Sequence, residues 1–183
     1  MALAALVAGC NTMGNPHAAT TPPPAPSPVL APVLAPLPVP LTGQAYSAAN
    51  PFAKILRGEL PAAKVYEDDK VLAFMDIAPV EFGHVLVISK TAQARNLLEI
   101  DDADLLRIIA VAKRVGRAQV AALGADGFSI EQNNGYGQTV GHLHVHVIPR
   151  YRGGVWGEKG GPRQTAAQLE PIAARIRAVL TAN

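Results

Sequence analysis

The sequence predicts a domain built from both strands and helices, preceded by a long segment that is not part of it. Short runs rich in β-branched residues alternate between apolar and polar positions, which is typical of strands. From Asp101, apolar residues instead recur at spacings of three and four, which is typical of an amphipathic helix. A chain of 183 residues permits one ordinary domain and a tail, and ten of its 16 prolines fall between Pro16 and Pro40.

The first 49 residues contain no Asp, Glu, Lys or Arg. Prolines at this density prevent helices and sheet ladders, because each lacks a backbone N–H, and they favour extended polyproline II. We therefore expect residues 20–49 to be a disordered, semi-rigid linker outside the folded domain. His17 in this segment is expected to be inert.

Residues 1–19 form an apolar leader, in which Val7-Ala8-Gly9-Cys10 resembles a bacterial lipoprotein cleavage box. The positively charged start of a signal peptide is missing. Either the true start lies upstream, or the match is a chance one in an Ala-rich run. The Pro-rich spacer favours the first explanation, since it would hold an anchored domain away from a membrane, so Cys10 is a candidate membrane tether.

The folded part is expected to begin at residue 50. A short helix at 51–58 would start at Pro51 and stop at Gly58. The next elements are a hairpin of strands at 65–67 and 71–74, a buried central strand at 83–88, a long helix from Asp101 to Gly124, and a strand at 128–133 antiparallel to a strand at 141–150. A C-terminal helix follows, starting either at Thr165, with Gln168 in a capping box, or near Glu170 because of Pro171.

The most informative stretch places His142, His144 and His146 at every second position of a predicted strand. Their side chains would share one face, while the intervening apolar residues pack against a core. Neighbouring histidines would lie about 6.6 Å apart and the outer two about 13 Å apart. A row of that length suits a phosphate chain better than a metal ion, because the third imidazole is badly placed to join the other two. One imidazole can attack phosphorus while the others hydrogen-bond its oxygens. A solvated strand face and a zinc site are the alternatives.

The motif His142-x-His144-x-His146, preceded by Gly137-Gln138-Thr139-Val140, resembles the histidine triad (HIT) family of nucleotide hydrolases and transferases. Four further segments, at 55–61, 65–69, 72–77 and 83–88, resemble its HINT-type branch in the same order. The resemblance covers residues 50–153 and implies an α+β domain with an antiparallel sheet of about five strands and a long packed helix, commonly a homodimer. Residues 154–183 would add a loop and the C-terminal helix.

The resemblance also implies catalytic roles. His144 would attack the α-phosphorus of a purine nucleotide derivative, and water would then hydrolyse the covalent nucleotidyl-histidine. His142 would orient the imidazoles, with His84 behind it as a support. His146 would bind the phosphate oxygens, and Thr139 would donate to the phosphate or the leaving group. Whether that leaving group is an amine, a second nucleotide or a sugar phosphate stays open.

Contacts to the nucleotide are implied in the same way. Asp76 would accept hydrogen bonds from the ribose hydroxyls, while Phe74 and Ile77 would line the base pocket. Phosphate contacts are expected from the loop residues Asn134, Gly137, Gln138 and Val140. This loop is shorter than in relatives, which leaves the role of Asn134 open.

Several features limit the partners. Many HINT-branch proteins carry zinc-binding cysteines where this chain has Asn50 and Ala53, so we expect neither a metal nor a cofactor. Cys10, the lone cysteine, excludes an internal disulfide. A formal net charge of +2 without a basic cluster argues against a nucleic-acid partner. The family's second histidine after the central strand is replaced by Ala92.

The sequence is also compatible with three other functions. A nucleotide-binding module without catalysis is one, and a metal-dependent hydrolase is another, although no acidic residue lies near the triad in sequence. A surface-tethered protein whose Pro-rich segment binds a partner is the third, and catalysis should then survive deletion of residues 1–49. With a genuine leader the protein would be a membrane-anchored lipoprotein; otherwise it would be cytoplasmic, as is usual in the family. Trp156 would cover the active site or a dimer seam.

Overall fold

The computed structural model describes residues 41, 44–154 and 160–182. The leader with Cys10, His17, most of the Pro-rich segment and Trp156 lie outside this part. Among the residues that are described, no helix combines the length and the apolar character needed to cross a membrane.

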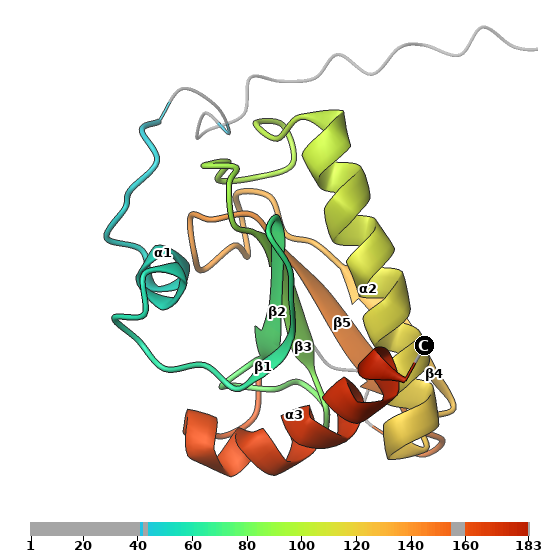
Figure 1. Cartoon of the computed structure of the whole chain (residues 1–183). Coiled ribbons are helices and arrows are strands. Elements are labelled where there is room, and N and C mark those ends of the chain that lie inside the picture. The colour runs from blue at the N-terminus through green and yellow to red at the C-terminus, as the bar shows by residue number, and fades with distance from the viewer. Residues whose placement is uncertain (1–40, 42–43, 155–159, 183) are drawn as a thin grey trace, which may run out of the picture. The chain divides into compact units, whose positions relative to one another are not determined.

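Five strands form one sheet in the order β1-β2-β3-β5-β4, and each neighbouring pair is antiparallel (Figure 1). The strands are β1 (Lys64–Glu67), β2 (Val71–Met75), β3 (Val85–Ser89), β4 (Gly127–Glu131) and β5 (His144–Arg150). The hairpin, the central strand and the antiparallel partner of the histidine strand were all expected from the sequence. The α+β prediction is thus confirmed.

Local side-chain chemistry explains where two of the helices begin. In α1 (Pro51–Leu56), the Asn50 side chain accepts from the Ala53 N–H at 2.9 Å. In α3 (Ala166–Thr181), Thr165 and Gln168 form a reciprocal capping box, so the helix starts at Thr165 rather than near Glu170.

The long helix α2 (Asp102–Leu123) ends as its sequence predicts. Asp101 caps its N-terminus by accepting from the Asp104 N–H at 2.9 Å. Gly124 adopts φ 72°, a left-handed conformation that favours glycine, and stops the helix.

The sheet has a different core on each face. On one face, α2 and α3 cover the main hydrophobic cluster, which includes Val87 and Val145. On the other face, α1 covers a smaller cluster built around Phe52, Phe74 and Leu86, and Figure 1 shows α1 across the sheet from α2. Side chains alternate along a strand, so β5 can send its apolar residues to the main core and its histidines to the α1 face.

A buried side chain from α2 joins the two strands that carry the histidines. Gln119 has no exposed surface, and its amide donates to the carbonyls of Gly83 and Val147, both at 2.9 Å. These carbonyls lie just before His84 and just after His146 in the chain. Gln119 therefore helps to hold the start of β3 beside the middle of β5.

Candidate active site

The sequence predicted all three triad histidines on one strand, but the structure places only two of them there. The strand β5 begins at His144, so His142 precedes it. Across the sheet, His144 pairs with Ile88 and His146 pairs with Leu86. Paired residues share a face, so His144 and His146 lie on the α1 face, as expected.

His144 is held in one tautomer by the backbone. Its Nδ1 lies 2.8 Å from the carbonyl oxygen of His142. A carbonyl only accepts, so Nδ1 carries the proton and Nε2 keeps its lone pair. The ring of Phe52 packs edge-on against His144 at a centroid distance of 5.1 Å. His144 therefore presents a fixed nitrogen with nucleophilic character.

His142 has a hydrogen-bond partner at each ring nitrogen. Its Nε2 lies 3.2 Å from the Ser89 carbonyl, and its Nδ1 lies 2.6 Å from the Tyr46 hydroxyl. Since the carbonyl must accept, Nε2 donates to Ser89, and Nδ1 accepts from Tyr46. The ring is 2% exposed. No pattern in the sequence pointed to Tyr46, because it lies in a segment that was expected to be outside the domain.

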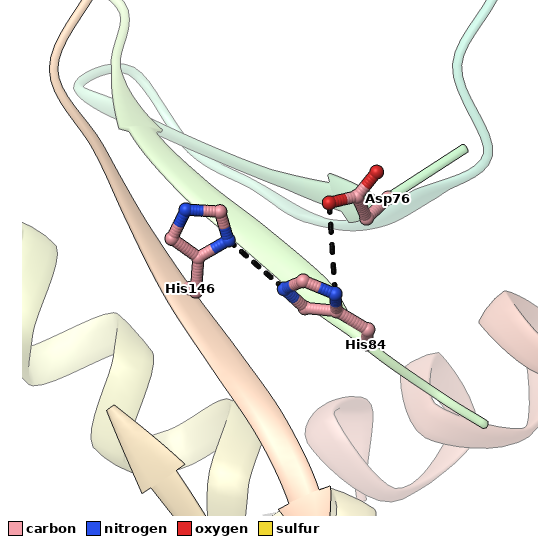
Figure 2. A group of neighbouring side chains, drawn as sticks. All are labelled: Asp76, His84 and His146. Carbon is pink, nitrogen blue, oxygen red and sulfur yellow. Dashed lines mark hydrogen bonds and ion pairs between the residues drawn. The ribbon is translucent and has the colours of Figure 1, made fainter. Parts of the chain in front are cut away.

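His84 lies beside His146 and not behind His142, so the expected support role was assigned to the wrong histidine. Its Nε2 is 3.0 Å from Nδ1 of His146 (Figure 2). The register of β3 against β5 explains the difference, because Val85 pairs with Val147 and this places the start of β3 near the far end of the triad.

The partners of His84 set the direction of this histidine pair. The Val80 N–H lies 3.2 Å from Nδ1 of His84 and can only donate to it. Oδ2 of Asp76, which can only accept, lies farther from the same Nδ1, at 3.5 Å, so the shorter contact with Val80 favours a neutral His84 that donates from Nε2 to Nδ1 of His146. In turn, His146 carries its proton on Nε2, and the amide nitrogen of Asn133, which is itself a donor, lies 3.5 Å from that atom without bonding to it. The hydrogen bonds from Val80 to His84 and from His84 to His146 thus leave His146 with a free N–H that can donate to a ligand.

Burial keeps the imidazoles of the site neutral. It lowers the pKa of His84, His142 and His146 to about 4, and it also lowers the pKa of His144. A nucleophile and a hydrogen-bond donor are therefore both available in their neutral forms near pH 7.

Asp76 also belongs to the site, although it lies far from the triad in sequence. Its Oδ2 is 3.5 Å from Nδ1 of His84, and its Oδ1 accepts from the Ala78 N–H at 2.8 Å. The fold thus brings a carboxylate to the histidines although none lies near the triad in sequence.

Asp76, His84 and His146 can each offer one ligand atom, and these atoms lie within 4.8 Å of one another (Figure 2). Two imidazoles and a carboxylate suit zinc and similar ions. The geometry here fits such an ion poorly, because Nδ1 of His84 accepts from Val80 and its Nε2 is occupied by His146. The two positions at which the resemblance implies zinc-binding cysteines are Asn50 and Ala53, so they provide no thiolate. Asn50 instead caps α1, and Ala53 is buried.

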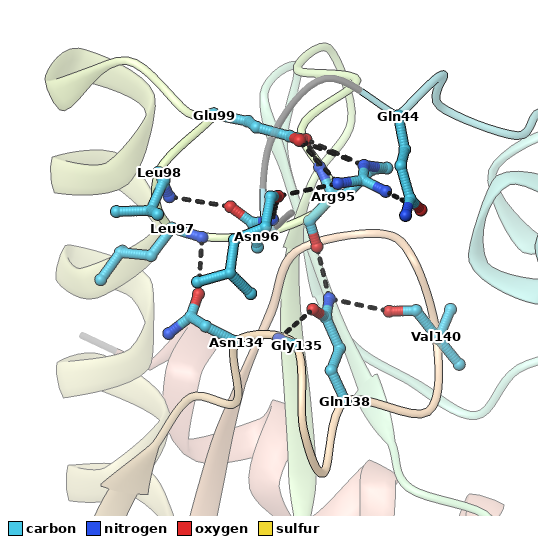
Figure 3. A network of polar contacts seen from close by, with 11 residues as sticks. Gln44, Arg95, Asn96, Leu97, Leu98, Glu99, Asn134, Gly135, Gln138 and Val140 are labelled. Atoms are coloured by element: carbon cyan, nitrogen blue, oxygen red, sulfur yellow. Dashed lines mark hydrogen bonds and ion pairs between the residues drawn. The ribbon is translucent and has the colours of Figure 1, made fainter. Parts of the chain in front are cut away.

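The loop before the triad is organised by Gln138. Its amide donates to the carbonyls of Arg95 and Val140 and accepts from the Gly135 N–H at 3.3 Å (Figure 3). Gln138 was expected to bind phosphate, but its side chain is engaged within the protein. Gly137 and Thr139 are exposed in the same loop, and Gly137 has φ 84°.

The amide of Asn134 is directed away from the histidines. It accepts from the Leu97 N–H at 2.8 Å and donates to Gln132 at 2.5 Å. Its neighbour Asn133 approaches His146 instead. The Asn134 side chain is therefore engaged within the protein, and its phosphate contact, which the shorter loop had left open, stays a prediction.

The two residues expected to line a base pocket differ in exposure. Phe74 is 3% exposed and packs edge-on against Phe52 at 5.4 Å. Ile77 is 41% exposed. Of the two, Ile77 has the surface open to a base, whereas Phe74 supports the α1 face from within.

Residues before position 50 contact the domain, upstream of the boundary we predicted. Arg95 donates to the Leu41 carbonyl at 2.8 Å and to Gln44 at 2.7 Å (Figure 3). Arg57 donates to the Ala48 carbonyl at 2.9 Å. Because Tyr46 also reaches His142, deletion of residues 1–49 would remove part of the site.

Comparison with known proteins agrees with this geometry. An uncharacterized HIT-like protein of Methanocaldococcus jannaschii is 46% identical over 104 residues, covering 56% of this chain and 79% of the relative. The adenosine 5'-monophosphoramidase hnt1 of Schizosaccharomyces pombe is 39% identical over 101 residues, covering 54% of this chain and 72% of the relative.

A solved structure has the same fold. The crystal structure of a Hit-like protein involved in cell-cycle regulation from Bartonella henselae, with an unknown ligand, superposes with a TM-score of 0.70 at 43% identity, covering 74% of this chain and 99% of that one. The HIT domain family matches residues 57–153. Those residues contain β1 to β5, α2 and all four histidines described above, and with them the chain belongs to the HIT family, with relatives in its HINT branch.

Proposed function

We propose that this protein is a nucleotide hydrolase or transferase that acts on the α-phosphate of a purine nucleotide derivative through a covalent nucleotidyl-histidine. The observation that carries the proposal is the bond from Nδ1 of His144 to the His142 carbonyl at 2.8 Å. It leaves Nε2 of a neutral imidazole as the nucleophile, without a general base to activate it.

The first step forms one bond and breaks one bond. Nε2 of His144 attacks the α-phosphorus, and the bond from phosphorus to the leaving group breaks. The departing group takes the proton that it needs from solvent. Nε2–H of His146, which the chain of bonds from Val80 through His84 makes available, donates a hydrogen bond to a phosphate oxygen. The hydroxyl of Thr139, in the exposed loop, is a second donor.

The second step releases the nucleotide. Water attacks the phosphorus of the nucleotidyl-histidine, the N–P bond breaks, and His144 regains its lone pair. The proton of the water passes to solvent, which returns the proton that the first step took. Two displacements then replace one direct attack by water.

The nucleoside end of the substrate would lie near the end of β2. The Asp76 carboxylate is set to accept from the ribose hydroxyls, and Ile77 offers an apolar surface to a purine. The exposed backbone around Gly137 can approach phosphate oxygens closely, since no Cβ stands in the way. The hnt1 relative is named as a phosphoramidase, which favours an amine as the leaving group.

The experiment is an intact-mass measurement on the full chain after brief mixing with an adenosine phosphoramidate. We expect an added mass of one AMP in the wild type and none in His144→Asn. His17→Asn is the matched control, because it makes the same substitution outside the domain and should still form the adduct. An adduct of equal yield on His144→Asn would rule out this nucleophile.

Two alternatives have their own outcomes. A nucleotide-binding module would bind AMP but consume no phosphoramidate. A metal-dependent hydrolase using Asp76, His84 and His146 would lose activity on treatment with EDTA and recover it with zinc. Turnover that EDTA leaves unchanged favours the covalent route.

We also propose a homodimer and a membrane tether. The strand β4 is at an edge of the sheet and exposes Phe128 (38%) and Ile130 (41%), so its open edge and apolar surface are suited to a second copy. Lipidation at Cys10 would anchor the domain through the Pro-rich segment. Sedimentation and a Cys10→Ser variant with fractionation test these two proposals.

A further inference from the structure

The Tyr46 hydroxyl makes a buried contact that the proposed reaction does not use. It lies 2.6 Å from Nδ1 of His142, and the two rings meet at a steep angle with centroids 5.6 Å apart. Tyr46 is 96 residues away from His142 in sequence. The contact therefore joins the N-terminal segment directly to the triad.

This hydrogen bond completes the bonding of His142. Nε2 donates to the Ser89 carbonyl, so Nδ1 must be an acceptor, and Tyr46 supplies its donor. Without the hydroxyl, a buried nitrogen would have no donor, which is costly. His142 would then be free to change its tautomer or turn its ring.

His142 in turn orients the nucleophile. The carbonyl of His142 accepts from Nδ1 of His144 at 2.8 Å, and this bond sets which nitrogen of His144 is free. His142 precedes β5, so the sheet ladder does not fix it. Its ring is held by Ser89 on one side, by Tyr46 on the other, and by an edge contact with the Phe52 ring at a centroid distance of 6.1 Å.

Tyr46 is itself held by contacts on both sides in the chain. Upstream, the guanidinium of Arg95 binds the Leu41 carbonyl and the Gln44 side chain, while Glu99 pairs with that guanidinium at 2.9 Å (Figure 3). Downstream, Arg57 binds the Ala48 carbonyl.

Two residues of the domain contact Leu41, which lies in the segment that carries Tyr46. Asn96 is 2% exposed, and its amide donates to the Leu41 carbonyl. A Cβ on Gly135 would overlap the side chain of Leu41. The buried amide of Asn96 binds the Leu41 carbonyl, and Gly135 leaves room for the Leu41 side chain. The segment therefore docks at a specific place on the domain.

We propose that Tyr46 is a positioning residue for catalysis, which acts on His144 through His142 and makes the N-terminal segment part of the active site. The proposal rests on the proposed covalent function. It predicts that Tyr46 affects the rate of the chemical step more than the affinity for the nucleotide.

The test compares full-length Tyr46→Phe with wild type. The substitution keeps the ring and removes only the hydroxyl. The matched control is Tyr66→Phe, which removes a hydroxyl bonded to Asp68 at 2.7 Å on the β1 edge of the sheet. The readouts are the rate of AMP-adduct formation, the Kd for AMP, and the ¹⁵N NMR signals of the His142 ring.

In Tyr46→Phe we expect adduct formation to slow about tenfold, the scale of one buried hydrogen bond, with Kd changed less than twofold. The ¹⁵N chemical shift of Nδ1 in His142 should move toward the value of an imine nitrogen that accepts no hydrogen bond. Tyr66→Phe should change none of these.

Wild-type rates together with an unchanged His142 signal in Tyr46→Phe would overturn the proposal. An adduct absent from the wild type would instead refute the covalent function. The NMR signal then decides alone whether Tyr46 positions His142: a shift supports it and an unchanged signal overturns it.

Discussion

The buried histidines should make the stability of this protein fall steeply below neutral pH, well before its carboxylates titrate. Burial lowers the pKa of His142 from its ordinary 6.5 to about 4. Between these values the unfolded chain binds a proton that the folded chain does not. The free energy of unfolding is therefore greatest above pH 6.5, falls as the pH is lowered to 4, and levels off below it as far as this group is concerned.

The size of the effect follows from the shift. One pKa unit corresponds to about 1.4 kcal/mol, so His142 costs about 2 kcal/mol between pH 7 and pH 5. His84 and His146 share one hydrogen bond, and we count them together as a second contribution of about the same size. The expected loss is about 4 kcal/mol, a large part of the 5–15 kcal/mol that is usual for a domain.

Carboxylates should add little in this interval. The pKa of Glu67, Asp68 and Glu99 is lowered in the folded protein, from ordinary values of 4.5, 3.8 and 4.5. Their unfolded forms bind protons mainly below pH 5. The interval from pH 7 to pH 5 therefore reports chiefly on the histidines.

The assay is urea unfolding followed by circular dichroism at pH 7, 6 and 5, in the wild type and in His142→Asn. The variant should be less stable at pH 7, because it loses the partners of His142. Its stability should nevertheless depend less steeply on pH, because a titrating group has been removed. Equal free energies of unfolding at pH 7 and pH 5 in the wild type would refute the reasoning, as would an unchanged slope in the variant.

Three further predictions concern the loop, a turn and the nucleophile. Asn133→Ala should slow turnover severalfold, because Asn133 faces the triad, whereas Asn134→Ala should lower the melting temperature with less effect on AMP affinity; steady-state kinetics and thermal scans separate the two. Gly83→Ala should lower the free energy of unfolding by about 2–4 kcal/mol, since φ is 92° and a Cβ would overlap a leucine of α2. Gly58→Ala has φ 76° but open space, so it should cost only about 1–2 kcal/mol, and similar losses in urea unfolding would contradict the packing explanation. Because burial lowers the pKa of His144, adduct formation per folded molecule should persist below pH 6.5, and a rate that halves at pH 6.5 would argue against a buried, neutral nucleophile.

Local patterns along the chain were enough to predict the elements and their ends. The bounds of α2 follow from Asp101 and Gly124, which act within one turn of the helix. The alternation of the triad likewise placed His144 and His146 on one face, because side-chain direction in a strand depends only on position. Where two local signals competed, at Thr165 and Pro171, the stronger capping box decided the start of α3.

Which side chains meet depends instead on how the elements pack. The partner of His84 depends on the register of β3 against β5, which no local pattern fixes, and the sequence pointed to His142 rather than His146. Asn133, and not Asn134, has the amide that lies 3.5 Å from His146, which depends on the conformation of the loop. Tyr46 was missed since a Pro-rich, uncharged segment carries no periodic signal, yet its last residues dock through hydrogen bonds to Arg95 and His142. Hydrogen bonds between residues far apart in sequence depend on the folded positions of both partners, so they had to be read from the structure.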